Sequence, residues 1–287
     1  MRTSIIYLDF LGVDRTGFRS YVVLIALFLS IAHLSAQKNT LRVGLGFSRI
    51  DRQDQIFSPL VHSGGSVQQI DLHWQRTGRL LQFAGISYGG FAASRFASFD
   101  YTQKPDTDIK TTLPHTFNMV ELTYGLGKQW QSGAFTLSAG GALENTVQAM
   151  YYQYGQAAFL GYFAAFSVSP WLNVSLPAGN AGAVQAGLSV PLVSWIARSP
   201  YLVNDDEFIE NISAHGGVAI FGNFIEDGSL QFPDKMQKVT AQLSFTRALG
   251  KKWTAGVRYR CQFIRQTDPL TLLSYQNDFR LEIGRKF

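Results

Sequence analysis

The last ten residues of the chain constrain its fold more than any other stretch. In residues 278–287 the apolar Phe279, Leu281 and Ile283 alternate with polar or charged residues, and the sequence ends on Phe287. A period of two indicates a β-strand with one apolar and one polar face. Such a strand can end on an aromatic residue at low cost if other strands pair with both of its edges and its apolar face meets lipid. We therefore expect a paired, membrane-facing terminal strand.

The same alternation recurs through most of the chain and predicts ten strands. They are expected at residues 41–48, 70–75, 79–91, 120–126, 135–150, 157–176, 183–197, 239–245, 253–263 and 274–287. Pro170 interrupts the sixth strand, and because proline removes a hydrogen-bond donor from a sheet, we expect a bulge or a turn there. The polar stretch 198–236 is too long for an ordinary connection and has room for an extra hairpin around Phe208 to Phe224. Eight or twelve strands therefore remain alternatives to ten.

The predicted connections alternate between short and long. Short turns fall near residues 77, 131, 180 and 250, and longer connections fall at 51–65, 93–115, 151–156, 198–236 and 266–273. A soluble β-sandwich has no reason to alternate its loop lengths, whereas a membrane barrel has short turns on one side and longer loops on the other. Ten strands also place both ends of the chain on the side of the short turns.

The terminal strand resembles the closing strand of Gram-negative outer-membrane β-barrel proteins, in which an apolar alternation also runs into a C-terminal phenylalanine. The resemblance implies an all-β fold, a transmembrane antiparallel up-and-down β-barrel, in the cell outer membrane. It also implies that Phe279, Leu281, Ile283 and Phe287 form an assembly signal, with outer-membrane lipid and the barrel-assembly machinery as partners. Arg285 departs from the family pattern, which more often has an apolar residue there. An amphipathic edge strand of a soluble sheet is the alternative for these ten residues.

The N-terminal residues have the pattern of a secretory signal peptide. Arg15 and Arg19 precede an apolar run at residues 21–32, and the small residue Ala36 precedes Gln37. The run is shorter than the about 20 apolar residues that a membrane-spanning helix needs. We expect residues 1–36 to be a cleaved signal peptide and residues 37–287 to form the barrel, with an uncleaved signal anchor as the alternative.

The composition fits a protein whose surface lies largely in hydrocarbon. Hydrophobic residues make up 46% of the chain and charged residues only 16%, whereas about 25% of the residues of soluble domains are charged. The net charge of +5 is not gathered into a basic stripe, so we expect no nucleic-acid partner. The single cysteine, Cys261, cannot form an internal disulfide.

Charged side chains gather on the strand face that points away from lipid. The candidate lumen charge network comprises Arg42, Asp71, His73, Glu121, Arg258, Arg260, Arg280 and Glu282. Most of these residues could meet, because the first, second, ninth and tenth strands are neighbours where a ten-stranded barrel closes. Buried charges must be paired. In one interpretation, the network is structural: its charges fill a narrow lumen and neutralise one another. A functional role has the excess of arginine form a constriction that selects anions.

The sequence gives weaker signals for chemistry. Asp71 and His73 share a face two residues apart, which could orient an imidazole, but the sequence has no motif of the barrel hydrolases. We expect no metal, because most histidines lie in separate loops. We also expect no cofactor, because no glycine-rich loop leads into a helix; Gly44 and Gly46 belong to a lipid-facing strand and should serve its curvature.

The predicted role is that of an integral outer-membrane barrel, structural or for passive small-solute transport, and an enzyme is the less favoured class. One alternative is an accessory barrel that binds an outer-membrane protein partner in a larger assembly, with residues 198–236 as the docking element. Another is a hydrolase that acts at the outer rim.

Overall fold

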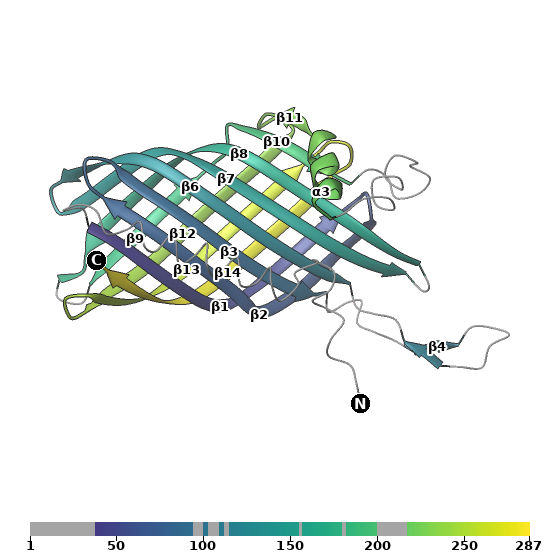
Figure 1. Ribbon diagram of the computed structural model, residues 1–287, viewed down its shortest axis with the longest axis horizontal. Helices are drawn as coiled ribbons and strands as arrows, with labels where there is room; N and C mark the ends of the chain where they lie inside the picture. Colours follow the sequence, from purple (N-terminus) through teal and green to yellow (C-terminus); the bar gives the residue numbers. More distant parts are fainter. Residues whose placement is uncertain are drawn as a thin grey trace.

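The computed structural model describes residues 38–93, 100–102, 109–111, 115–154, 157–179, 182–199 and 217–287. One antiparallel sheet closes on itself and forms a β-barrel with strands tilted to its axis (Figure 1). The C-terminus lies at one end of the barrel together with the short turns, and we call this the short-turn end (Figure 1). The longer connections lie at the opposite end, the loop end. The prediction of an all-β antiparallel barrel is confirmed.

The barrel wall consists of long strands, and a few smaller elements lie at the loop end. The wall strands are β1 (Lys38–Asp54), β2 (Ser58–Thr77), β3 (Leu81–Ala92), β6 (Thr116–Ser132), β7 (Phe135–Tyr154), β8 (Ala157–Pro177), β9 (Ala183–Ser189), β10 (Val193–Arg198), β12 (Met236–Leu249), β13 (Trp253–Gln266) and β14 (Leu272–Lys286). The smaller elements are the hairpin of β4 (Asp100–Thr102) and β5 (Ile109–Thr111), the helix α3 (Gly217–Glu226) and the strand β11 (Ser229–Gln231).

The wall has ten strand positions. Their order is β1-β2-β3-β6-β7-β8, then β9 with β10, then β12-β13-β14, and β14 pairs with β1. β9 and β10 share one position because both pair with β8, β9 over residues 183–189 and β10 over residues 193–198. The prediction of about ten strands is therefore confirmed.

The terminal strand β14 closes the barrel. It pairs with β13 on one edge and with β1 on the other, as expected for a strand that ends on an aromatic residue. The backbone amide of Phe287 donates to the carbonyl of Asn39 at 3.0 Å, and the amide of Asn39 donates to the carbonyl of Phe287 at 3.1 Å. The last residue therefore adds two backbone hydrogen bonds to the closure, and its ring is exposed on the surface.

The register fixes the tilt of the strands. From Gly46 of β1, paired residues lead through β2, β3, β6 and β7 to Phe163 of β8. In the other direction they lead through β14, β13, β12 and β9 to Ser175, twelve residues further along β8. Such an offset in a ten-position barrel tilts the strands by about 40°. Ser169 lies halfway between the two end points, so it lies at the height of Gly46.

The outer surface of the wall is apolar and the lumen is polar. On β13, Val257 and Tyr259 are exposed outside, whereas the side chains of Arg258 and Arg260 are only 14% and 15% exposed. This facing agrees with the sequence alternation. Exposed apolar residues form a belt around the wall: Val43, Leu45, Phe47, Ile70, Ile86, Leu122, Leu143, Leu172, Leu188, Leu243, Val257 and Leu281. A belt of this kind fits the hydrocarbon layer around a membrane barrel.

Two of the predicted loops are mostly strand. β1 continues to Asp54 and β2 begins at Ser58, so only residues 55–57 of the predicted loop 51–65 form a turn. β7 extends to Tyr154 and β8 begins at Ala157, so residues 151–154 of the predicted connection 151–156 are strand, and residues 155 and 156 lie outside the described residues. The wall therefore rises beyond the apolar belt. On this part of β1 the outward residues Arg49 and Asp51 are polar, so the alternation that reveals a strand disappears there.

The irregularity expected at Pro170 lies in the neighbouring strand. β8 runs unbroken through Pro170, which pairs with Gly141 of β7. On the other side the partner strand has one extra residue, because Trp171 pairs with Ser189 but Val168 pairs with Val193. The carbonyl of Pro170 points to this partner strand and accepts a hydrogen bond from the amide of Val190 at 3.4 Å. Because proline has no amide hydrogen, Pro170 cannot donate a hydrogen bond back to the same strand. The break between β9 and β10 falls beside it.

The segment 198–236 has a helix where part of a hairpin was expected. Phe208 lies outside the described residues, but Phe224 belongs to α3. β11 follows α3 and pairs with β10. Figure 1 shows α3 beside β8 and β10 near the loop end. A hairpin that reaches Phe224 is therefore wrong.

The predicted signal peptide, residues 1–36, lies outside the described residues. Within the ranges described, no helix is both long and apolar enough to cross a membrane.

Candidate functional site

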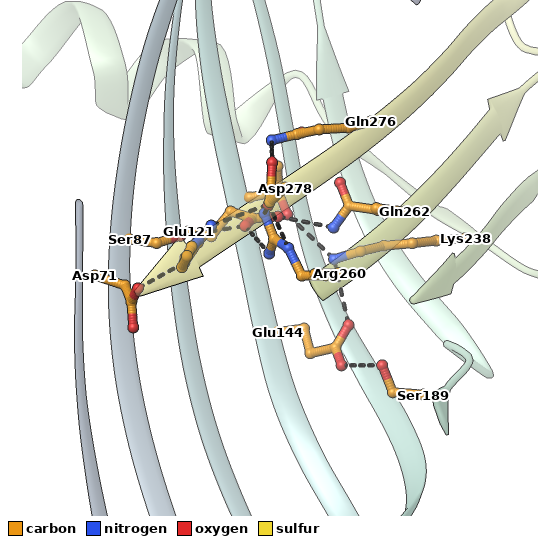
Figure 2. Close-up of polar contacts among 12 residues, drawn as sticks. Asp71, Ser87, Glu121, Glu144, Ser189, Lys238, Arg260, Gln262, Gln276 and Asp278 are labelled. Atoms are coloured by element: carbon orange, nitrogen blue, oxygen red, sulfur yellow. Dashed lines mark hydrogen bonds and ion pairs between the residues drawn. The ribbon is translucent and has the colours of Figure 1, made fainter. Parts of the chain in front are cut away.

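Arg260 is the centre of a charge network in the lumen (Figure 2). Its Nη2 lies 2.5 Å from Oδ2 of Asp278 on the neighbouring β14, and its Nε donates to the same oxygen at 2.7 Å. Arg260 also forms an ion pair with Glu121 of β6, and β6 lies opposite β13 in the strand order. Gln262 and Ser87 donate to the same Glu121 carboxylate at 2.8 and 3.2 Å. Arg260 therefore ties opposite walls together across the lumen.

Two more arginines extend the network toward the short-turn end. Arg280 lies 3.1 Å from Asp71 and 3.0 Å from Asp278, measured from its Nη atoms to the carboxylate oxygens. Arg258 Nη2 lies 2.7 Å from Glu282 Oε1, and its Nη1 lies 3.7 Å from Asp71 Oδ2. Asp71 and Asp278 thus each contact two arginines, so the carboxylates are shared rather than paired one to one.

A separate ion pair joins β12 to β7. Lys238 Nζ lies 3.2 Å from Glu144 Oε2 and donates to Thr146 Oγ1 at 3.2 Å. Ser189 donates to the other oxygen of Glu144 at 2.6 Å, and Figure 2 shows Glu144 between these two partners. This pair links β12 to β7 beside the break between β9 and β10.

The structure brings six of the eight proposed network residues into ion pairs and leaves two at the edge. The six are Asp71, Glu121, Arg258, Arg260, Arg280 and Glu282. Arg42 instead donates to Gln75 Oε1 at a long 3.4 Å. The ring of His73 stacks on Phe83 with centroids 6.0 Å apart. The Asp71 carboxylate contacts Arg258 and Arg280 and accepts no hydrogen bond from His73, so the two do not form the imidazole–carboxylate pair that a hydrolase would need.

Sequence reasoning missed three members of the network: Glu144, Lys238 and Asp278. Each of them stands next to an apolar residue on the opposite face of its strand, so the alternation itself places them in the lumen. With them included, the described network has five basic and five acidic residues. These are Arg42, Lys238, Arg258, Arg260 and Arg280, and Asp71, Glu121, Glu144, Asp278 and Glu282. The excess of positive charge that suggested an anion-selective constriction is absent from this set.

A small polar cavity lies on the short-turn side of the network. Its volume is about 190 Å³, and its lining includes Arg42, His73, Asn173, Gln185 and Arg258. Pockets for small molecules usually have about 300 Å³ or more. A polar cavity of this size suits a few water molecules better than an organic ligand.

The loop-side half of the lumen is filled by apolar side chains. The buried cluster consists of Ile50, Phe91, Ala93, Phe117, Met119, Met150, Phe163, Ala165, Ile196, Met236, Ile264 and Leu272. These residues come from β1, β3, β6, β7, β8, β10, β12, β13 and β14, with Ala93 just after β3, so they meet around the barrel axis. We call this cluster the apolar plug.

A buried ionic cluster adjoins the apolar plug. Asp54 lies 3.0 Å from Arg52 and 2.5 Å from Arg198, and all three side chains are at most 2% exposed. Arg198 also donates to Gln266 and to the backbone carbonyl of Leu270. The cluster therefore connects β1, β10 and the connection between β13 and β14, which closes the lumen near the loop end.

Gly44 leaves room for one member of the network. It pairs with Asp71 across β1 and β2, and a Cβ at Gly44 would lie 2.1 Å from Asp71 Oδ1. A side chain here would displace the carboxylate that contacts both Arg258 and Arg280. Gly44 thus accommodates a charged partner in addition to the curvature expected of it.

We expect Gly44→Ala to lower the free energy of unfolding by about 1–3 kcal/mol, the usual cost of overpacking. Equilibrium unfolding in lipid vesicles measures this change. Gly141→Ala is the matched control, because nothing lies within 4 Å of a Cβ built there, and its effect should stay within about 0.5 kcal/mol. Equal effects of the two substitutions would contradict the role of Gly44.

The described residues contain no group of three or more histidine, cysteine or acidic residues arranged to hold a metal ion.

Comparison with solved structures identifies outer-membrane barrels as similar folds. The outer membrane protease OmpT from Escherichia coli aligns with a TM-score of 0.52 at 6% identity, over 89% of this chain and 99% of that chain. The translocator domain of the autotransporter NalP from Neisseria meningitidis has a TM-score of 0.41 at 7% identity, over 96% and 99%. No family model and no curated protein matches the sequence.

At 6% identity the likeness to OmpT concerns the fold and transfers no activity. It agrees with what the chain itself displays, a closed ten-position barrel with an apolar belt outside and paired charges inside. The chain therefore has the fold of the Gram-negative outer-membrane β-barrel proteins.

Proposed function

We propose that the protein is a closed structural barrel of the outer membrane that passes no solute through its lumen. The apolar plug is the observation that carries this proposal, since Phe163 and Met150 at its centre are 0% exposed. An aqueous pathway requires a continuous polar channel, and a hydrophobic constriction excludes water and ions. A passive pore for small solutes is the competing role.

The charge network supports the same role. The ion pair between Arg260 and Glu121 crosses the lumen, so it obstructs the path that a solute would take. Within the charge network, the equal number of acids and bases also leaves no surplus charge with which a narrow pore could select ions. Paired charges that link opposite walls instead make the barrel rigid, which is the expected property of a structural protein.

Conductance across planar lipid bilayers tests the proposal. We expect folded protein, identified by its heat-modifiable mobility on a gel, to insert without producing single-channel events, because the apolar plug closes the lumen. A general porin inserted under the same conditions is the positive control. Discrete openings of the unmodified protein would contradict the closed barrel and favour passive transport.

The accessory and hydrolase roles make different predictions. An accessory barrel should co-purify with an outer-membrane protein in a fixed ratio after mild detergent extraction. If the protein is a rim hydrolase, the purified and folded barrel should cleave peptide or lipid substrates without any other protein. Either result would replace the purely structural role, even if conductance remained absent.

A further inference from the structure

α3 is held against the outside of the barrel wall, and β11 pairs with the edge of β10 and so continues the wall itself. The ring of Phe224 stacks on Tyr162 of β8 with centroids 4.1 Å apart and planes at 10°. The Nε1 of Trp195 on β10 donates to the carbonyl of Ile225 at 2.9 Å. Tyr162 alternates along β8 with the lumen-facing Phe163, so it points outward. α3 therefore covers a patch of the outer surface and does not enter the lumen.

The surface that this segment presents to its surroundings is also apolar. Phe221 of α3 is 43% exposed, Leu230 of β11 is 56% exposed, and Phe232 just after β11 is 53% exposed. Residues 221–225 carry no charge, and Glu226 is the only acidic residue of the helix. A helix that faced water would have polar residues on its outer side. α3 thus has apolar side chains toward the wall and away from it.

This apolar surface extends nearer to the loop end than the apolar outer face of β1 does, on the opposite side of the barrel. Gly46 and Ser169 lie at the same height, so Arg49 of β1 lies at the height of Phe166 of β8, each three residues nearer the loop end. There the outer face of β1 is polar, with the Arg49 side chain 73% exposed. α3 contacts the wall at Tyr162, which lies beyond that height.

The raised apolar surface is continuous with the lipid-facing belt. Below α3 and β11, the exposed Val168 and Leu192 lead down to Leu172 on the same side of the barrel, with exposed fractions of 47%, 59% and 44%. An interfacial helix lies in the plane of the membrane with its apolar side chains at the boundary of headgroups and acyl chains. The height of α3, just beyond the belt, matches that boundary.

We infer that α3 and β11 form a lipid-docking surface, which buries Phe221, Leu230 and Phe232 among the acyl chains of the outer leaflet. Continuity with the belt favours lipid over any other occupant, since the same phase already covers the wall directly below. On β1 itself the wall is charged at the corresponding height, although Val67 of the neighbouring β2 is 85% exposed. The membrane should therefore reach higher on the wall beside β8 and β10 than beside β1.

Site-directed fluorescence in vesicles tests this inference. Phe221→Cys and Leu230→Cys are each made in a Cys261→Ala background, labelled with an environment-sensitive fluorophore such as NBD, and folded into phosphatidylcholine vesicles. A second set of vesicles contains lipid with a nitroxide high on the acyl chain. Leu281→Cys on the belt, 61% exposed, is the control for lipid contact, and Arg49→Cys is the control for water contact.

We expect labels at positions 221 and 230 to emit at shorter wavelength than the label at 49 and to lose fluorescence in nitroxide vesicles, as the label at 281 does. Only samples that migrate as folded protein are compared. Emission at 221 and 230 like that at 49 would overturn the inference. A blue shift without nitroxide quenching, or one that grows with the ratio of protein to lipid, would assign the surface to a second copy of the chain and also overturn it.

Discussion

Replacing Arg260 by alanine is expected to destabilise the folded barrel by about 3–5 kcal/mol, the cost of breaking a buried ion pair from one side. Arg260 contacts Asp278 and Glu121 at once, and the Asp278 side chain is only 1% exposed. Without the guanidinium, each of these carboxylates loses an ion-pair partner in a lumen closed by the apolar plug. The measurement is the free energy of unfolding in lipid vesicles, from urea titrations in both directions.

Arg49→Ala is the control for Arg260→Ala. This substitution also removes an arginine side chain, but from the outer surface, where Arg49 is 73% exposed and lies 3.7 Å from Asp51. An exposed pair of this kind contributes up to about 1 kcal/mol, so the control should change the stability little. Asp278 still contacts Arg280 in this variant, so an equally mild effect of Arg260→Ala would mean that water solvates the Glu121 carboxylate. The closed barrel proposed above would then be wrong.

The parts of the wall that cross the lipid could be predicted from the sequence because two solvents act on the two faces of each strand. On β13 and β14 hydrocarbon selects Val257 and Leu281 on one face, and the polar lumen selects Arg258 and Arg280 on the other. The resulting period of two is strong. This alternation also predicts which side chains face the lumen, even where their partners lie far away in the sequence.

The strand ends beyond the lipid could not be predicted, because the contrast between the two faces is lost there. Around residue 51 the outward residues are polar, as Arg49 and Asp51 show, and the inward Arg52 and Asp54 are charged as well. Residues 51–55 are five polar residues in a row, and such a run indicates a loop. The buried Asp54 is paired with Arg198, which lies 144 residues away, and no local pattern reveals that contact.

The charge network could be predicted only in part for a similar reason. Strand order at the closure of the barrel brings Arg258 near Glu282 and Asp71, and the sequence alternation is enough to propose this. The pair of Arg260 with Glu121 and that of Lys238 with Glu144 join strands across the lumen. Such pairs depend on the width and stagger of the barrel, which follow from the register and not from any single strand.

α3 was missed because it lacks the features that mark a surface helix. Its residues Gly217–Glu226 include no charge before the last position, so no polar stripe shows a helical period. A helix that lies between an apolar wall and an apolar environment has no need for such a stripe. The absence of a pattern is thus consistent with the lipid-docking role inferred for α3.

Val257→Arg is expected to lower the free energy of unfolding by about 2–4 kcal/mol, the cost of a cation on the lipid face near the bilayer midplane. Val257 is 36% exposed on the outside of β13 and pairs with Leu281 and Phe245, which are also part of the outer surface. An arginine at this position can reach neither the lumen carboxylates nor water without a distortion of the bilayer. Unfolding in vesicles of defined chain length measures the cost.

Leu249→Arg provides the depth control for Val257→Arg. Leu249 is 53% exposed and ends β12 at the short-turn end, where the belt meets the headgroups. The cost of an arginine falls to about 0–1 kcal/mol near the interface, so Leu249→Arg should be mild although it exposes the same charge. A large effect at Val257 with a small one at Leu249 would require that β13 crosses the hydrocarbon with Val257 outward. A harmless Val257→Arg would mean that this face of β13 does not meet lipid, and both the facing and the position of the belt would have to be revised.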